Sequence, residues 1–286
     1  MTETKPLVER IEELLSAGEV TLPVMDKTAL LIHEEVHKSE PDLNRIEKLV
    51  TYDQTLTAEL LRVANSAFFR GLRKISTVRE AMVRLGTERM AEIVLLTTQS
   101  VNFSSRSPLV RSYMKTLWHH SVSCAVGAHW LARESGYTSL THEAFVAGLL
   151  HDIGKVFLLR VIDSVLASED GRNLVNESLV LEVMDSLHTT YGARLMEDWN
   201  LPESISTVTR EHHNMEVDQH QPLLALVRII DLVSNKLGLG FKKEQFYVPS
   251  ITAEADMLGL DEIKLAELEV YLEDSHALAE AIFQRP

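Results

Sequence analysis

The stretch that decides the fold is Ala144-Phe145-Val146-Ala147-Gly148-Leu149-Leu150, followed directly by His151-Asp152-Ile153-Gly154-Lys155. Its apolar half predicts a buried helix, and an imidazole and a carboxylate stand side by side where that helix ends. Such a pair is suited to binding one metal ion. Whether it belongs to a metal centre depends on the ligands that the rest of the chain supplies.

Apolar residues recur at helical spacing through most of the chain, and no alternating strand pattern of useful length appears in its first third. The predicted fold class is therefore all-α, a two-lobed helical bundle. A turn-forming stretch at 102–108 predicts the boundary between the lobes. We expect an N-terminal lobe over 1–105, a second lobe over 106–237, and a C-terminal part over 238–286 with a loop and one or two short helices that pack on the domain.

Composition is that of an ordinary globular protein, with 286 residues of which 45% are hydrophobic and 24% are charged. The formal net charge of -14 argues against broad nucleic acid binding. A single cysteine, Cys124, excludes an internal disulfide framework, and we expect a cytoplasmic protein. The first six residues lack the features of a signal peptide, and no apolar run is long enough to span a membrane. Nothing in the sequence indicates the oligomeric state.

Basic residues are densest between positions 62 and 89. The pattern fits a solvated helical face, and the alternative is a surface for an anionic ligand or an acidic partner. The residues concerned are Arg62, Arg70, Arg73, Lys74, Arg79, Arg84 and Arg89.

Ligand-type residues accompany the His-Asp pair at several places in the second lobe, all on predicted helices. Asp231 is informative because it lies inside the apolar run 227–233, where an ionised carboxylate is costly to bury unless it is paired or bound to a cation. By itself it is also compatible with a groove position beside an arginine or water. Imidazoles mixed with carboxylates suit Fe, Mn, Zn or Ni. The candidate metal ligands are His120, His151, Asp152, His188, His212, His213 and Asp231.

The remaining histidines are interpreted as packed or surface residues. His33 and His37 stand four positions apart and are able to share a metal, but no third ligand accompanies them in the sequence, so a structural role is favoured. His119 is a candidate proton shuttle beside His120. The structural group also includes His129, His142, His220 and His276.

The segment 149–155, taken with His120-Ser121 and Asp231, resembles the HD superfamily of metal-dependent phosphohydrolases. The additional histidines at 188, 212 and 213 resemble its HD-GYP branch. The resemblance implies an HD-domain-like second lobe in which the seven candidate ligands hold two divalent metal ions. It further implies that Asp152 bridges the ions and that Lys155 contacts a substrate phosphate, so these two residues are the catalytic candidates.

The first lobe resembles a different branch of the superfamily. The segments 53–69, 75–81 and 117–121, together with Leu22-Pro23 and Leu85-Gly86, are similar to the signature of HDOD domains, an output domain of bacterial signalling proteins. The similarity extends over about residues 20–235. It implies a signal-transduction output domain whose partner is a signalling protein or a nucleotide-type ligand.

Departures from both patterns leave the activity open. HDOD domains often lack part of the ligand set and are then regarded as non-catalytic, whereas this chain keeps every position. Residues 214–222 lack the Gly-Tyr-Pro loop of the HD-GYP branch, and Thr116 stands where some relatives have a glutamate for a third metal. We therefore expect a regulatory domain with a dinuclear metal centre. The alternatives are an active metal-dependent phosphohydrolase or phosphodiesterase acting on a nucleotide or cyclic nucleotide, and a metal-free structural relic.

Overall fold

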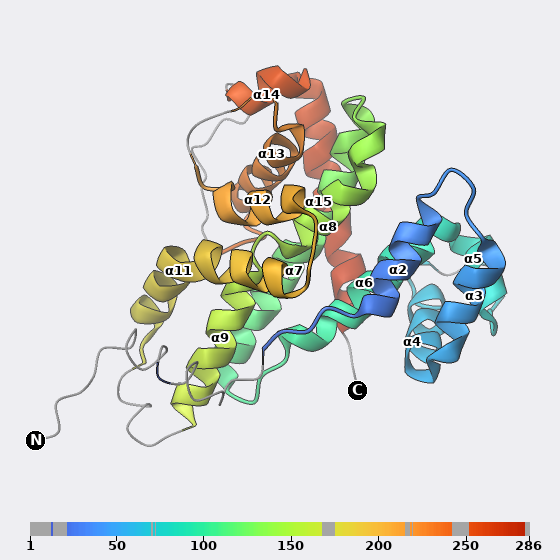
Figure 1. Cartoon of the computed structure of the whole chain (residues 1–286), viewed down its shortest axis with the longest axis horizontal. Coiled ribbons are helices and arrows are strands. Elements are labelled where there is room, and N and C mark those ends of the chain that lie inside the picture. The colour runs from blue at the N-terminus through green and yellow to red at the C-terminus, as the bar shows by residue number, and fades with distance from the viewer. Residues whose placement is uncertain are drawn as a thin grey trace, which may run out of the picture.

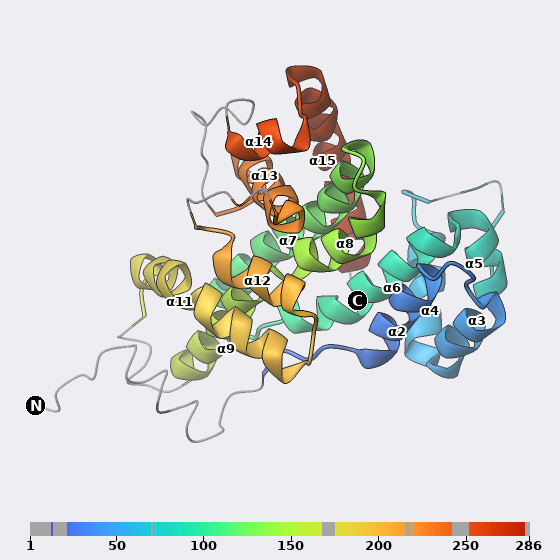
Figure 2. The same ribbon diagram turned by 45° about the horizontal axis from the view of Figure 1, so that its top comes forward.

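A computed structural model of the whole chain describes residues 13, 22–69, 71, 73–167, 175–214, 218, 220–241 and 252–283. These residues form helices joined by short loops and turns, with no strand among them (Figure 1). The predicted all-α fold class is confirmed. Helices α2 to α5 form a small group on one side, and α6 connects them to the larger group built around α7 and α8 (Figures 1 and 2).

The first helices begin at residues whose side chains cap free backbone N–H groups. Asp26, Asp42 and Asp53 each accept such hydrogen bonds, and Thr77 forms a capping box with Glu80. These caps set where the helices start. The helices of this part are α2 (Lys27–Val36), α3 (Leu43–Tyr52), α4 (Gln54–Ala64), α5 (Val78–Leu85) and α6 (Thr87–Ser100).

The second group of helices is built around α7, which is 27 residues long. Helix α8 ends at Leu150 and α9 begins at Ile153, so His151 and Asp152 occupy the corner between them. The group comprises η1 (Val101–Phe103), α7 (Pro108–Glu134), η2 (Thr138–Leu140), α8 (Thr141–Leu150), α9 (Ile153–Leu166), α11 (Glu177–Asp198), α12 (Glu203–Glu211) and α13 (Pro222–Lys236).

The C-terminal part differs from the prediction. It contains the short α14 (Ala253–Leu258), but α15 (Glu262–Phe283) is 22 residues long, so the expectation of short helices alone is wrong. Its leucines stay buried along the whole length because α15 packs on α7. Residues 242–251, most of the predicted loop, lie outside the part of the chain that the structure describes.

Helix α15 also reaches the N-terminal helices. The indole N–H of Trp118 on α7 donates to the carbonyl of Ala279 at 3.0 Å. Arg62 on α4 donates to the carbonyls of Ala281 at 2.7 Å and Ile282 at 3.1 Å. These carbonyls are among the last of the helix, which have no partner inside it. The end of α15 therefore holds α4 and α7 together.

Two glycines allow the closest helix contacts in the second group. A Cβ atom on Gly148 would lie 2.5 Å from the carbonyl oxygen of Cys124, and one on Gly154 would lie 1.9 Å from that of His188. Real Cβ atoms do not approach backbone atoms so closely. Only glycine therefore permits α8 to lie this near α7, and α9 this near α11.

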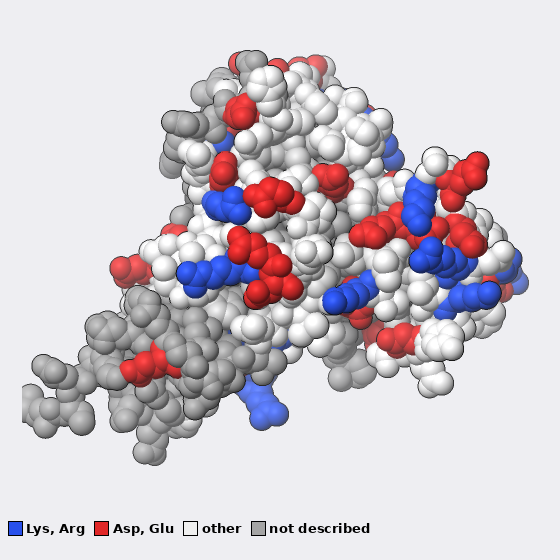
Figure 3. Space-filling view, in the orientation of Figure 1, with Lys and Arg blue, Asp and Glu red and all other residues white. Residues whose placement is uncertain are grey.

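The basic residues between 62 and 89 are mostly engaged. Arg62 pairs with Glu59, Arg79 with Glu47, and Arg89 with Glu92, while Arg84 donates to backbone carbonyls. On the face seen in Figure 3, acidic and basic side chains alternate over α2 to α5. The pattern favours the solvated helical face over an anionic-ligand surface; Arg70 lies outside the described residues. No helix in the described ranges is long and apolar enough to cross a membrane.

Candidate metal centre

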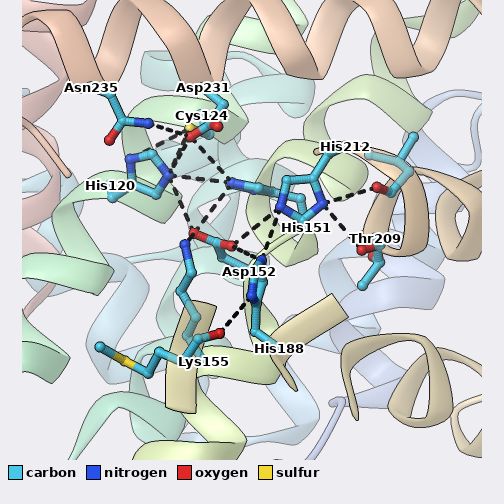
Figure 4. A network of polar contacts seen from close by, with 12 residues as sticks. His120, Cys124, His151, Asp152, Lys155, His188, Thr209, His212, Asp231 and Asn235 are labelled. Carbon is cyan, nitrogen blue, oxygen red and sulfur yellow. Dashed lines mark hydrogen bonds and ion pairs between the residues drawn. The ribbon is translucent and has the colours of Figure 1, made fainter. Parts of the chain in front are cut away.

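Six of the seven candidate ligands converge in the second group of helices (Figure 4). Each comes from a different position along the fold, and each is buried. His120 lies within α7, His188 within α11 and Asp231 within α13, whereas His151, Asp152 and His212 stand at helix ends. The sequence pattern thus found residues that the fold brings to one place.

Asp152 lies at the centre and presents its two carboxylate oxygens to two sets of ligands. Its Oδ2 is 3.5 Å from the Nε2 atoms of both His120 and His151. Asp231 joins this set, with Oδ1 3.2 Å from His120 Nε2 and 3.9 Å from His151 Nε2. The Asp152 Oδ1 atom is 3.5 Å from the Nε2 atoms of both His188 and His212. One carboxylate therefore separates two groups of ligand atoms.

Backbone carbonyls fix the tautomers of three of these histidines. The Nδ1–H of His151 donates to the carbonyl of Gly148 at 2.8 Å, and that of His188 donates to Met184 at 2.7 Å. His212 Nδ1 donates in the same way to Val208 and Thr209, at 3.2 and 3.1 Å. Because a carbonyl only accepts, Nδ1 must carry the proton, and in a neutral imidazole Nε2 then has a lone pair.

These lone pairs face one another, which is unfavourable without a cation between them. His188 Nε2 lies 3.3 Å from His212 Nε2, and the buried Asp152 Oδ1 between them has no hydrogen-bond donor among the described residues. Ligands bound at about 2.1 Å to one tetrahedral ion are roughly 3.4 Å apart. The donor set therefore fits a divalent cation in both chemistry and spacing.

Burial keeps the imidazoles in the form that binds metal. It lowers the pKa of His151 to about 4 and that of His188 to about 3. Both rings are accordingly neutral at physiological pH, because loss of solvent disfavours the charged form. Metal ions are bound by neutral imidazole rather than by imidazolium.

Lys155 lies against the centre. Its Nζ donates to Asp152 Oδ2 at 2.7 Å, and its side chain is 12% exposed. Burial opposes ionisation of Asp152, but the Lys155 ammonium holds the pKa of that carboxyl well below its usual range. The carboxylate and the ammonium are thus both charged in a nearly closed site.

The two other predicted residues are placed differently. His213 is exposed, and its ring centroid is 4.1 Å from that of His212 and 5.0 Å from that of His188. The ligand nitrogens of these three histidines lie within 4.8 Å of one another, so His213 stands at the rim of the second ligand group. His119, the candidate proton shuttle, points to α15, where its Nε2 is 3.1 Å from Glu280 Oε1. The structure therefore does not bring His119 to the centre.

Sequence reasoning missed Cys124, which lies one helical turn after His120 on α7. Its Sγ is 3.6 Å from His120 Nε2, and the ligand atoms of His120, Cys124, His151 and Asp231 all lie within 4.8 Å of one another. Burial raises the pKa of its thiol, so it is protonated at neutral pH unless a cation displaces the proton. Its position four residues after His120, on the same face of a helix, was the sequence signal that would have identified it as a possible ligand.

Asn235 and Gly240 also surround the centre. The Asn235 side-chain amide donates to Asp231 Oδ1 at 2.9 Å. A Cβ on Gly240 would lie 2.1 Å from Asn235 Oδ1 and 3.3 Å from His120 Nδ1. The segment after α13 therefore folds closely over the His120 side of the cluster.

Comparison with known families identifies the domain type. The profile of the HDOD domain matches residues 22–215. An uncharacterised protein of Treponema pallidum (strain Nichols) is 25% identical over 237 residues, which is 81% of this chain and 45% of the relative. The cyclic di-GMP phosphodiesterase CdgJ of Vibrio cholerae is 31% identical over 121 residues, 42% of this chain and 26% of the relative. The chain spans less than half the length of the curated relatives that it matches.

Solved structures share the same fold. An HDOD domain protein of unknown function from Geobacter sulfurreducens superposes with a TM-score of 0.75 at 24% identity, covering 97% of this chain and 98% of the other. A candidate metal-dependent phosphohydrolase from Shewanella amazonensis SB2B gives a TM-score of 0.66 at 16% identity, with 97% and 98% covered. At these identities the similarity establishes the arrangement of helices.

Proposed function

This chain belongs to the HDOD domain family, and we propose that it is a bacterial signal-transduction output domain with a regulatory role that binds a dinuclear metal centre. The observation that carries the proposal is the pair of ligand groups on the two oxygens of Asp152. The domain division proposed with it is the N-terminal lobe 1–105, the HD-like lobe 106–237 and the C-terminal part 238–286.

The proposed ligand sets follow from the two groups. His120, His151 and Asp231 hold one ion, and His188 and His212 hold the other, with His213 completing the second set from the rim. Asp152 would bridge the ions. Such ions, as Fe, Mn, Zn or Ni, would supply a Lewis acid and lower the pKa of bound water.

Burial of the ligands supports regulation over turnover. The His151 and Asp152 side chains are 0% and 1% exposed, so little of the centre is open to a phosphate ester. The Lys155 ammonium, a candidate phosphate contact, already donates to Asp152. The expected partner is another signalling protein or a nucleotide-type ligand, whose binding the state of the centre controls.

Metal analysis tests the proposal. Full-length protein is purified, loaded separately with Mn, Fe or Zn, desalted, and measured by inductively coupled plasma mass spectrometry. Asp152→Asn keeps the shape of the side chain but removes the bridging charge, and we expect it to lose metal at this centre. His220→Gln, a change at an exposed histidine outside the cluster, is the matched control. Equal metal content in wild type and Asp152→Asn would contradict a centre bridged by this carboxylate.

An active phosphohydrolase or phosphodiesterase acting on a nucleotide or cyclic nucleotide is the second candidate. It is favoured by the position of Lys155, whose ammonium donates a hydrogen bond to Asp152. An ammonium in this position is suited to binding a phosphate oxygen. The Vibrio relative is a cyclic di-GMP phosphodiesterase, and the Shewanella protein of similar fold is a candidate metal-dependent phosphohydrolase. Metal-loaded protein is assayed on bis-p-nitrophenyl phosphate and cyclic dinucleotides. Hydrolysis that exceeds a His151→Ala, Asp152→Ala control would favour this function.

A further inference from the structure

A second group of histidines lies where the N-terminal helices meet α8. His33 on α2, His37 at the end of α2 and His142 on α8 place their ring centroids 4.3 to 4.8 Å apart. Their ligand nitrogens all lie within 4.8 Å of one another. The sequence pattern showed only the pair on α2, and folding supplies the third imidazole from a distant part of the chain.

Four ring nitrogens of this group lack hydrogen-bond partners among the described residues: both of His33, Nε2 of His37 and Nδ1 of His142. His33 is 0% exposed, and among the described residues neither of its ring nitrogens has a partner. His142 Nδ1 is likewise buried without one. A buried polar group left unpaired costs about 1–3 kcal/mol, and such groups are rare in folded proteins. Several unpaired nitrogens that converge on one point indicate a missing common partner.

His37 is oriented for metal binding. Its Nδ1 donates to the carbonyl of His33 at 2.7 Å, which leaves the lone pair on Nε2. In known metal sites, a hydrogen bond from the other ring nitrogen to a carbonyl or carboxylate orients the imidazole ligand in the same way. Glu88 Oε1 on α6 lies 3.5 Å from His37 Nε2 and also 3.5 Å from His129 Nε2. The Glu88 side chain is 51% exposed, so it borders the group from the solvent side.

We propose that His33, His37 and His142 form a binding site for one divalent transition metal ion, with Glu88 as the fourth ligand. Three imidazoles and one carboxylate in a roughly tetrahedral arrangement suit Zn²⁺ best. Small rotations of the half-buried His37 and His142 rings bring the nitrogens to the roughly 3.4 Å that such a site requires. This site shares no ligand with the centre at Asp152 and does not depend on it.

The position of the site gives it a structural consequence. An ion bound there joins α2 and α6, from the N-terminal group, to α8, from the second group. Helix α8 carries His142 in its first turn, and His151 caps its C-terminal end nine residues later, which is about 13 Å along the helix axis. One helix would thus connect the two metal centres.

Zinc stoichiometry of the full chain tests the site. His142→Gln removes one ligand from a half-buried position, and we expect it to lower the zinc content by about one equivalent while the metal at the Asp152 centre remains. Asp152→Asn is expected to leave the zinc at His142 in place, and His220→Gln serves as the control. Retained metal at the Asp152 centre shows that the His142→Gln protein is folded. Unchanged zinc content in His142→Gln would overturn the proposal.

A second measurement needs no substitution. Zn²⁺ is titrated into the wild-type protein while long-range ¹H–¹⁵N spectra record the histidine ring nitrogens. We expect the Nε2 signal of His37 and ring signals of His33 and His142 to shift together at a single stoichiometric step. Ring signals of these three residues that stay unchanged at saturation would overturn the site even if every variant fails to fold.

Discussion

Gly154→Ala is expected to separate the two ligand sets of the Asp152 centre. The added Cβ would lie 1.9 Å from the carbonyl oxygen of His188 and 2.8 Å from the backbone nitrogen of Gly192, both on α11. Backbone atoms have no rotamer by which to avoid the contact. Helix α9 must therefore move away from α11, and His188 moves away from Asp152.

The size of the movement follows from the contact distance. Ordinary van der Waals contact begins at 3.4 Å, so the two backbones must separate by about 1.5 Å. Metal–ligand distances hold to within about 0.2 Å, and a shift of this size breaks the bond to His188. Overpacking of a core contact costs about 1–3 kcal/mol in the free energy of unfolding, which leaves a folded protein to examine.

The assay combines metal content with thermal unfolding. We expect Gly154→Ala to remain helical by circular dichroism, unfold at a lower temperature and lose the metal held by His188 and His212. Gly127→Ala is the matched control, because its Cβ would meet side-chain rather than backbone atoms, the nearest being the terminal Leu272 Cδ2 methyl at 2.6 Å. Wild-type metal content and affinity in Gly154→Ala would refute the reasoning.

Three further predictions concern the same centre. Gly148→Ala places a Cβ 2.5 Å from the carbonyl oxygen of Cys124, so it should push α8 away from α7. We expect weaker binding of the ion held by His120 and His151, while the other ion is retained. Equal loss of both ions would contradict this. Lys155→Met leaves the buried Asp152 carboxylate without its ammonium, and the chelated protein should lose roughly 3–5 kcal/mol of unfolding free energy in urea titrations. Added metal should restore most of it, and equal losses with and without metal would count against metal binding at Asp152. For the chelated wild type, stability should be full above the unfolded histidine pKa of 6.5 and fall as the pH drops toward 4, because the unfolded chain takes up the proton first. His151, with a folded pKa of about 4, accounts for about 3 kcal/mol of this loss, and urea midpoints that do not change between pH 7 and 4 would contradict it.

The sequence predicted the fold class and the residues of the centre because both depend on local patterns. Helical spacing of apolar residues marked the helices, and an aspartate inside an apolar run marked Asp231. The length of α15 was not predicted because its apolar residues do not gather on one face of the helix, so the sequence shows no clear helical periodicity there.

The finer geometry depends on contacts between distant segments. Which oxygen of Asp152 faces which histidines is set by the packing of α9 against α11, and no spacing in the sequence encodes it. His142 is 105 positions after His37, so its approach to that pair follows from the way α8 packs near α2. The spacing of Cys124 from His120 was visible in the sequence, but a buried free cysteine is most often an ordinary core residue.

The contacts of α15 bear on how fragments of this protein should be cut. The HDOD profile ends at residue 215, yet Asp231 and all of α15 come after it. A fragment limited to the matched residues would lack an acidic ligand and would expose the apolar side of α7, including Trp118, to water. If such a fragment failed to bind metal, the cause would be incomplete folding and a missing ligand rather than the chemistry of the intact domain. The boundary of shared sequence and the boundary of independent folding differ here by the three helices α13, α14 and α15.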